Sequence, residues 1–171
     1  MRGLLPRFAA VRCGGYTDAM TCQKLPTGIQ TFREIREDDC CYVDKTGIAV
    51  QLATQGKHYF LSRPRRFGKS LFLDTLAELF HGSRELFTGL VAETAWDWSV
   101  RHPVIHISLG ASEVRDRAEL EDKLLEQLGI NQDPLNIRCT QTRSSTCFGE
   151  LIRRAHAQAG QRVVVLIDEY D

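Results

Sequence analysis

Apolar residues along this chain follow two patterns, short continuous runs and longer stretches at helical spacing. The stretch 69–81 places its apolar residues on one face of a helix: Leu71, Phe72, Leu76, Leu79 and Phe80. Gly82 follows directly, and a glycine in that position is typical of a helix end. The preceding run 58–61 is aromatic and apolar, which predicts a short buried strand. We therefore expect strand, loop and helix in that order around Gly68.

The same two patterns divide the rest of the chain. Further helices are predicted at 45–55, 85–91, 113–128 and 147–158, with Gly56, Gly129 and Gly160 as end signals, and 32–37 is a short amphipathic segment. The runs 104–109 and 162–169 are predicted strands, and 131–145, which contains Pro134, is a predicted loop. Strands that alternate with helices and are apolar throughout favour an α/β fold whose mainly parallel sheet is covered on both faces.

Length and charge limit the number of domains and the classes of binding partner. The 171 residues, 43% of them hydrophobic, fit one globular domain. Residues 1–24 lack a clear period, so we expect a poorly packed tail before a domain at 25–171, with Met20 as an alternative start to Met1. Positive and negative side chains balance at 22 each. No overall field attracts nucleic acid or an anionic membrane, and any anion site must be local.

Cysteines raise the question of a metal site or a disulfide framework. There are six: Cys13, Cys22, Cys40, Cys41, Cys139 and Cys147. None forms a C-x-x-C pair, so we interpret them as free thiols in a reducing cytosol. The longest apolar runs are well below the ~20 residues of a membrane helix, and Pro6 and Arg7 interrupt any signal-type core. We expect a cytoplasmic protein without membrane contact.

Residues 63–70 form a basic loop that ends in Gly-Lys-Ser. The phosphate-binding loop, or Walker A motif, reads G-x-x-x-x-G-K-S/T, and here Arg63 holds the place of its first glycine. In this motif Gly68 lets the backbone approach an oxygen, Lys69 reaches the β- and γ-phosphates, and Ser70 ligates Mg²⁺. The alternative is a glycine that starts a helix and is followed by a solvated Lys-Ser pair.

Residues 163–169 fit the second motif of such a site, Walker B. Asp168 comes at the tip of an apolar strand, where its carboxylate can hold the Mg²⁺ shell through water. Glu169 follows and can orient and deprotonate an attacking water. A buried strand that ends in two solvated acids is the alternative. Because both motifs occur in the right order and on the right elements, the sequence predicts a P-loop nucleotide site.

Other polar residues leave two interpretations open. Arg63, Arg65 and Arg66 can reach the phosphates, or can contact a nucleic-acid backbone. Asp44 and Lys45 can line the nucleotide, but a helix N-cap explains Asp44 equally well. The five histidines and both tryptophans are interpreted as packing or surface residues.

Four blocks together resemble the AAA-ATPase-like family of bacterial P-loop proteins. They are Leu25-Pro26-x-Gly28-Ile29-Gln30-x-Phe32-Arg33-x-Ile35-Arg36, Tyr42-Val43-Asp44-Lys45-Thr46, the stretch 59–71, and Leu166-Ile167-Asp168-Glu169-Tyr170-Asp171. The resemblance implies a P-loop three-layer sandwich, with Arg63 as the family's own form of the loop. It also implies an ATP site at Arg63, Pro64, Arg65, Arg66, Phe67, Gly68, Lys69, Ser70 and Leu71, Mg²⁺ ligands Ser70 and Asp168, and catalytic residues Lys69 and Glu169.

Members of that family often continue into a nuclease-like domain of the PD-(D/E)XK type, through which a nucleic-acid partner would be reached. The sheet order of the class places a later strand between the P-loop strand and the strand of Asp168. We therefore expect a fragment whose sheet is incomplete at its C-terminal side, and whose ATP hydrolysis needs the missing strands. The alternative is a non-catalytic remnant that acts through protein or nucleic-acid contacts.

Overall fold

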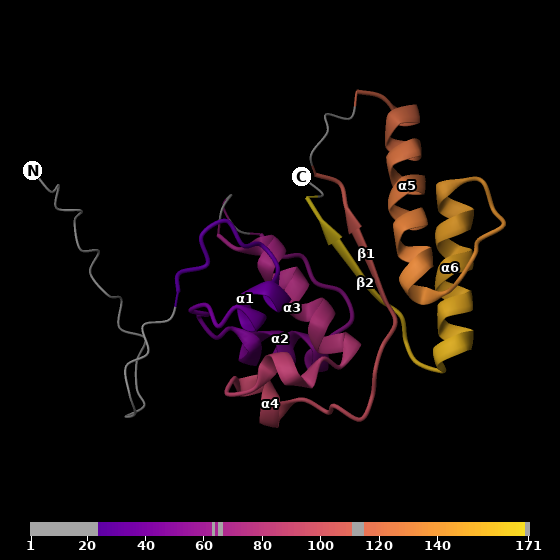
Figure 1. Ribbon diagram of the computed structural model, residues 1–171. Coiled ribbons are helices and arrows are strands. Elements are labelled where there is room, and N and C mark those ends of the chain that lie inside the picture. The colour runs from indigo at the N-terminus through magenta and orange to yellow at the C-terminus, as the bar shows by residue number, and fades with distance from the viewer. Residues whose placement is uncertain (1–23, 63, 65–66, 111–114, 170–171) are drawn as a thin grey trace, which may run out of the picture.

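The structure is a computed structural model that describes residues 24–62, 64, 67–110 and 115–169. In chain order its elements are α1 (Phe32–Glu37), α2 (Thr46–Gln55), α3 (Lys69–His81), a 3₁₀ turn (Arg84–Phe87), α4 (Val91–Ala95), β1 (Val104–Ser108), α5 (Arg117–Leu135), α6 (Ser144–Ala159) and β2 (Val164–Asp168) (Figure 1). The predicted tail lies outside the described residues except for Lys24, which forms a bridge with Cys40. No helix in the described part of the chain is long and apolar enough to cross a bilayer.

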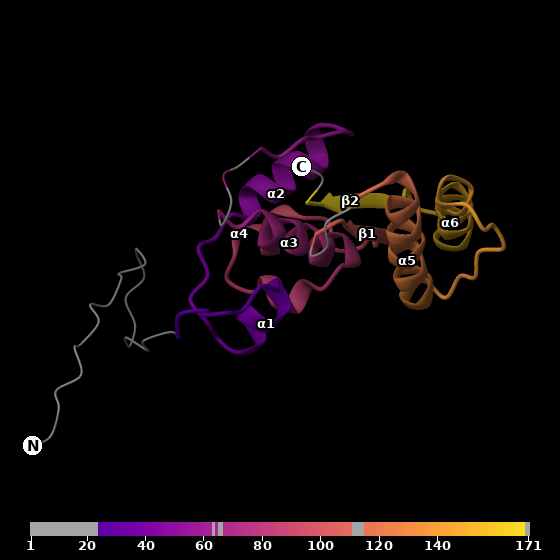
Figure 2. The same ribbon diagram turned by 90° about the horizontal axis from the view of Figure 1, so that it is seen from above.

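The two strands pair in parallel at the centre of the molecule. Their register runs from Val104 opposite Val164 to Ser108 opposite Asp168. Figures 1 and 2 show α1 to α4 on one side of this pair and α5 and α6 on the other. The prediction of an α/β fold with parallel strands between helices is confirmed at this level, for a sheet of two strands within the described residues.

A separate hydrophobic cluster lies on each side of the strands. The first is built from α1 to α4 and the 3₁₀ turn and contains Phe32, Ala49, Phe72, Leu79, Leu86, Phe87 and Ala92. Trp96 and Trp98 pack against it, as predicted. The second contains Ile105, Ile107, Leu128, Ile137, Cys147, Leu151 and Ala155 from β1, α5, α6 and the intervening loop. Since each fully buried large apolar side chain stabilises by roughly 1.5–3 kcal/mol, these clusters hold the helices against the strands.

The predicted strand at 58–61 is wrong for this structure. Residues 57–62 form no strand, and the side chains of Tyr59 and Phe60 are 53% and 78% exposed. A strand is stable only when a neighbour takes up its backbone hydrogen bonds, and no described segment pairs with this run. The apolar composition of 58–61 predicts a strand, but a strand also needs a neighbour, and the described residues contain none for this run.

The predicted end of α5 at Gly129 is also wrong. The helix continues to Leu135, so the predicted loop at 131–145 begins only after it. Asn136 ends the helix in the left-handed conformation, with φ of 52°, and its N–H bonds the carbonyls of Gln132 and Asp133. Where one helix is predicted at 85–91, the structure has the 3₁₀ turn Arg84–Phe87, and α4 begins only at Val91.

Polar side chains of α5 bond the outer edge of β1 and the residues that follow it, and Asn131 does so from the extra turns of the helix. Asn131 donates from Nδ2 to the carbonyl of His106 and accepts from its N–H at Oδ1, both at 2.8 Å. Gln127 Oε1 accepts from the N–H of Ser108 at 3.1 Å. Lys123 Nζ donates to the carbonyls of Leu109 and Gly110. We call Lys123, Gln127 and Asn131 the polar row of α5.

The spacing of the polar row matches the spacing of the strand. Its members are four residues apart, which is about 6.0 Å along a helix, and two strand residues cover about 6.6 Å. Helix side chains thus bond successive outward backbone groups of β1, as a neighbouring strand would. On the opposite edge, the outward N–H groups of Val165 and Ile167 in β2 have no hydrogen-bond partner among the described residues.

Candidate functional site

The start of α3 is preceded by a glycine in the left-handed conformation. Gly68 has φ of 71° and ψ of 34°, a conformation that other residues adopt only under strain. A Cβ at Gly68 would meet nothing within 4 Å, so backbone conformation rather than crowding requires glycine. Backbone N–H groups in the first turn of a helix have no intrahelical acceptor, and together with the helix dipole they favour an anion.

The predicted loop residues lie around this helix start. Lys69 and Ser70 are the first two residues of α3, with Lys69 half-buried and Ser70 exposed. Pro64 and Phe67 are exposed before the helix, whereas the side chain of Leu71 packs against the first hydrophobic cluster. Arg63, Arg65 and Arg66 lie outside the described residues.

The predicted acid pair lies at the carboxyl end of β2. Asp168 is 7% exposed, and its Oδ1 accepts from the N–H of Glu169 at 2.9 Å. The Asp168 carbonyl accepts from the N–H of Leu109, which extends the pairing with β1 by one bond. Glu169 is exposed and has φ of 53°, the left-handed region that is uncommon for a residue with a side chain. Because α3 packs beside β2, both motifs belong to neighbouring elements (Figures 1 and 2).

The donor set suits a cation that keeps most of its ligands outside the protein. No group of three His, Cys, Asp or Glu side chains in the described part of the chain could hold a metal ion. Ser70 offers a hydroxyl and Asp168 a carboxylate, both hard oxygen ligands. Mg²⁺ is usually bound by one or two such groups together with water and substrate phosphates, so the residues fit this ion together with a nucleotide.

The structure gives Asp44 a role in joining α2 to α4. Its Oδ1 accepts from the N–H and the hydroxyl of Thr46 at 2.8 and 2.6 Å, and its Oδ2 accepts from the N–H of Val91 at 2.8 Å. Thr46 Oγ1 in turn accepts from the N–H of Ala92 at 3.0 Å. Of the two interpretations of Asp44, this geometry favours the capping of helix ends.

We expect Asp44→Ala to lower the free energy of unfolding by about 1–3 kcal/mol, since it removes acceptors from two helix starts. Burial raises the pKa of the Asp44 carboxyl, but hydrogen bonds from Thr46 and Val91 outweigh it, and the net pKa lies below the usual 3.8. This contribution is therefore present at neutral pH and is lost as the pH falls through the folded-state pKa.

Urea unfolding at pH 7 and near pH 3 measures this effect. The exposed Asp122→Ala serves as the matched control and should change stability by less than about 0.5 kcal/mol. Equal stability of Asp44→Ala and the parent chain at pH 7 would contradict the capping role.

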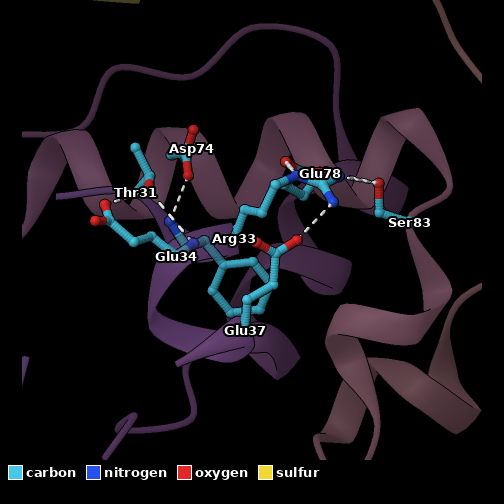
Figure 3. A network of polar contacts seen from close by, with 8 residues as sticks. Thr31, Arg33, Glu34, Glu37, Asp74, Glu78 and Ser83 are labelled. Atoms are coloured by element: carbon cyan, nitrogen blue, oxygen red, sulfur yellow. Dashed lines mark hydrogen bonds and ion pairs between the residues drawn. The ribbon is translucent and has the colours of Figure 1, made fainter. Parts of the chain in front are cut away.

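A second polar region joins α1 to α3 and borders an open groove of ≈ 230 Å³ (Figure 3). The groove is lined by Thr31, Arg33, Glu34, Glu37, Asp74 and Glu78. Arg33 pairs with Glu78 through two hydrogen bonds of 3.0 and 2.9 Å, and Ser83 Oγ donates to the same carboxylate at 2.6 Å. The N–H of Phe32 donates to Asp74 Oδ2 at 2.5 Å, while burial raises the pKa of the Asp74 carboxyl.

This groove is a poor candidate for a phosphate site. Its charged lining is mostly carboxylate, with Arg33 the single cation among its lining residues. Like charges repel an anion, and Arg33 is already paired with Glu78. The interactions in Figure 3 therefore hold α1 on α3, and the start of α3 remains the candidate site.

Comparison with known proteins identifies the family to which the chain belongs. The α/β fold carries a left-handed glycine before a helix that begins Lys-Ser, beside a strand that ends in an acid pair. The chain belongs to the family described as "Predicted AAA-ATPase", whose model matches residues 26–171. A family of predicted AAA-ATPases is consistent with nucleotide binding in general.

A curated relative extends well beyond this chain. The chain is 63% identical over 153 residues to the "Uncharacterized protein in vnfD 5'region" of Azotobacter chroococcum mcd 1. The match covers 89% of this chain and 30% of that protein, so the chain spans less than a third of the relative's length. No solved structure matches the chain.

Proposed function

We propose that this chain binds ATP with Mg²⁺ at the start of α3, in a P-loop site of the Walker A and Walker B type. The observation that carries the proposal is Gly68 in the left-handed conformation directly before a helix that begins with Lys69 and Ser70. Such a helix start provides backbone donors and a favourable dipole for phosphate. The family described as "Predicted AAA-ATPase" supports the same class of ligand.

Each residue has a defined task in this proposal. Backbone N–H groups at Gly68 to Leu71 cradle the phosphates, and the Lys69 ammonium binds their terminal oxygens. The Ser70 hydroxyl and the Asp168 carboxylate hold the Mg²⁺, which supplies charge neutralisation at the phosphates when bound. Glu169 orients and deprotonates the attacking water in hydrolysis. Arg63, Arg65 and Arg66 are further candidate contacts to the phosphates.

The test is Mg-ATP binding by the parent chain and by Lys69→Ala, measured by calorimetry. Loss of charged hydrogen bonds worth about 1.5–3 kcal/mol should weaken binding about 10- to 100-fold. Lys57→Ala, at an exposed lysine before the loop, is the matched control and should bind as the parent does. Equal affinity of Lys69→Ala and the parent chain would refute the site.

The whole protein's activity is a further part of the proposal. Because the chain spans 30% of its curated relative, we propose ATP hydrolysis for the full-length context, in a three-layer P-loop sandwich completed by further strands. The open outer edge of β2 supports this, since Val165 and Ile167 present backbone groups that an added strand would bond. A cytoplasmic location and a nucleic-acid partner reached through a nuclease-like domain remain predictions.

A further inference from the structure

Ser108 is the last residue of β1 and lies directly opposite Asp168, the last residue of β2. Successive side chains of a strand alternate between the two faces of a sheet, and residues opposite each other in the register point to the same face. Neighbouring strands are about 4.8 Å apart. The sheet therefore places the hydroxyl of Ser108 beside the carboxylate of Asp168, and backbone pairing fixes this neighbourhood.

The face that Ser108 shares with Asp168 is the one covered by α3. Ile105 and Ile107 belong to the second hydrophobic cluster, with α5 and α6, so the side chains of His106 and Ser108 point to the opposite side. On that side, burial raises the pKa of a carboxyl of α3, that of Asp74, and the nearby His106 opposes this increase. Figures 1 and 2 show α3 along this side of the strands, and in Figure 1 its start lies at the same end of the molecule as both arrowheads. Ser108 is thus on the side and at the end of the sheet where the nucleotide site is proposed.

Both side chains have oxygen atoms without a partner among the described residues. Asp168 Oδ1 accepts from the N–H of Glu169 at 2.9 Å, whereas its Oδ2 bonds no described residue. The Ser108 hydroxyl also bonds none of them, although Gln127 Oε1 holds the N–H of Ser108 at 3.1 Å. Asp168 is 7% exposed and Ser108 is half-buried. Polar groups withdrawn from water cost free energy unless they bond a partner, so this pair suits a hydrated ligand that brings its own donors.

We propose that Ser108 belongs to the magnesium site, where its hydroxyl bonds the water shell of the ion that Asp168 holds. The proposal rests on the proposed function, in which Ser70 and Asp168 hold the Mg²⁺. This ion keeps several of its waters when it binds a protein, and groups that hydrogen-bond its ligands orient them and raise its affinity. A serine hydroxyl donates one hydrogen bond and accepts others, so it serves carboxylate and water alike. Ser108 is a positioning residue in this arrangement.

A purely structural role for Ser108 makes a different prediction. If the side chain only packs between the strand and α3, its replacement should alter ATP affinity equally with and without Mg²⁺. If the hydroxyl belongs to the magnesium site, only the affinity measured with Mg²⁺ should change. Threonine and valine separate the two cases, because both have the same shape and suit a strand, and threonine alone has a hydroxyl.

The experiment uses the full chain and three variants, Ser108→Ala, Ser108→Val and Ser108→Thr. Calorimetry measures the affinity for ATP with excess Mg²⁺ and with a chelator in its place, and the melting temperature without ligand confirms folding. The alanine and valine variants should bind Mg-ATP about 10-fold more weakly and metal-free ATP within about twofold of the parent chain, since groups that hold metal ligands contribute about 10- to 100-fold in metal affinity. The threonine variant should bind Mg-ATP within about threefold of the parent, because it keeps the hydroxyl.

Ser99→Ala is the matched control. The hydroxyl of Ser99 also has an aspartate beside it and donates to Asp97 Oδ1 at 2.6 Å. Ser99 is exposed and lies in the segment between α4 and β1. Loss of this hydroxyl should change neither of the two affinities.

The outcomes separate this proposal from the proposed function. Equal Mg-ATP affinity of Ser108→Val and the parent, losses of equal size with and without Mg²⁺, or a loss in Ser108→Thr as large as that in Ser108→Val would each overturn the role of Ser108. A parent chain that binds ATP equally well with and without Mg²⁺ would also overturn it and leave the phosphate site at Lys69 standing. Failure of the parent chain to bind Mg-ATP would instead refute the proposed function.

Discussion

In the full-length context, replacement of Glu169 by glutamine is expected to lower the proposed ATP turnover by about 10²- to 10⁴-fold, the usual contribution of a general base. Glutamine keeps the size of the side chain but cannot accept a proton from water. Mg-ATP affinity should stay within about threefold, because Lys69, Ser70 and Asp168 rather than Glu169 are the residues proposed to bind the nucleotide and its Mg²⁺. Glu169 is exposed, so the folded structure should tolerate the change.

Hydrolysis measured by phosphate release and binding measured by calorimetry together test this prediction. Glu126→Gln, an exposed residue on α5, makes the same chemical change away from the site and should alter neither quantity. Turnover of Glu169→Gln equal to that of the parent would show that another group activates the water. Loss of binding in the same variant would show that Glu169 holds the nucleotide or its Mg²⁺ rather than the water.

The sequence predicts local structure well where end signals and apolar periodicity agree. For α3, apolar spacing and Gly82 give both the helix and its end, and Gly82 adopts the left-handed conformation with φ of 77°. The strands β1 and β2 are found from continuous apolar runs, and their parallel pairing follows from the helices between them. In each of these cases the information lies within a few consecutive residues.

The sequence fails where distant partners decide the outcome. Gly129 costs α5 about 1 kcal/mol relative to alanine, a penalty that suggested a helix end. The hydrogen bonds of Asn131 to His106 offset that penalty, and the helix continues. The run 58–61 illustrates the reverse case, since a suitable composition forms no strand without a partner among the described residues.

For the candidate site too, the sequence predicts the residues that a motif holds in consecutive positions. Lys69, Ser70, Asp168 and Glu169 are identified from two motifs, because each motif carries its chemistry in consecutive residues. The polar row of α5, which lies outside this site, is missed, because its hydrogen-bond partners lie on other elements. The sequence contains one signal for this row. In 113–128 and beyond, polar residues recur at intervals of about one helical turn and so share one face of the helix. That face bonds a strand, whereas the polar face of a charged helix is usually solvated.

The polar row makes a prediction about stability that does not depend on nucleotide chemistry. Asn131 is buried and bonds the N–H and carbonyl of His106 as well as the carbonyl of Gln127. Asn131→Leu, which has a similar shape, removes all of these bonds and leaves outward backbone groups of β1 without partners. We expect the free energy of unfolding to fall by about 2–5 kcal/mol, with a decrease in melting temperature of about 10 °C.

Thermal and urea unfolding of a graded series tests this expectation. Gln127→Met removes one hydrogen bond to β1 and should cost about 1 kcal/mol, less than Asn131→Leu. Gln30→Leu, at an exposed position before α1, controls for the change from amide to apolar side chain and should alter stability by less than about 0.5 kcal/mol. If Asn131→Leu is as stable as the parent, then apolar packing of α5 rather than its polar row closes the outer edge of β1. The graded order is expected because a buried strand edge is stabilised only by groups that bond its N–H and carbonyl, and Asn131 bonds both.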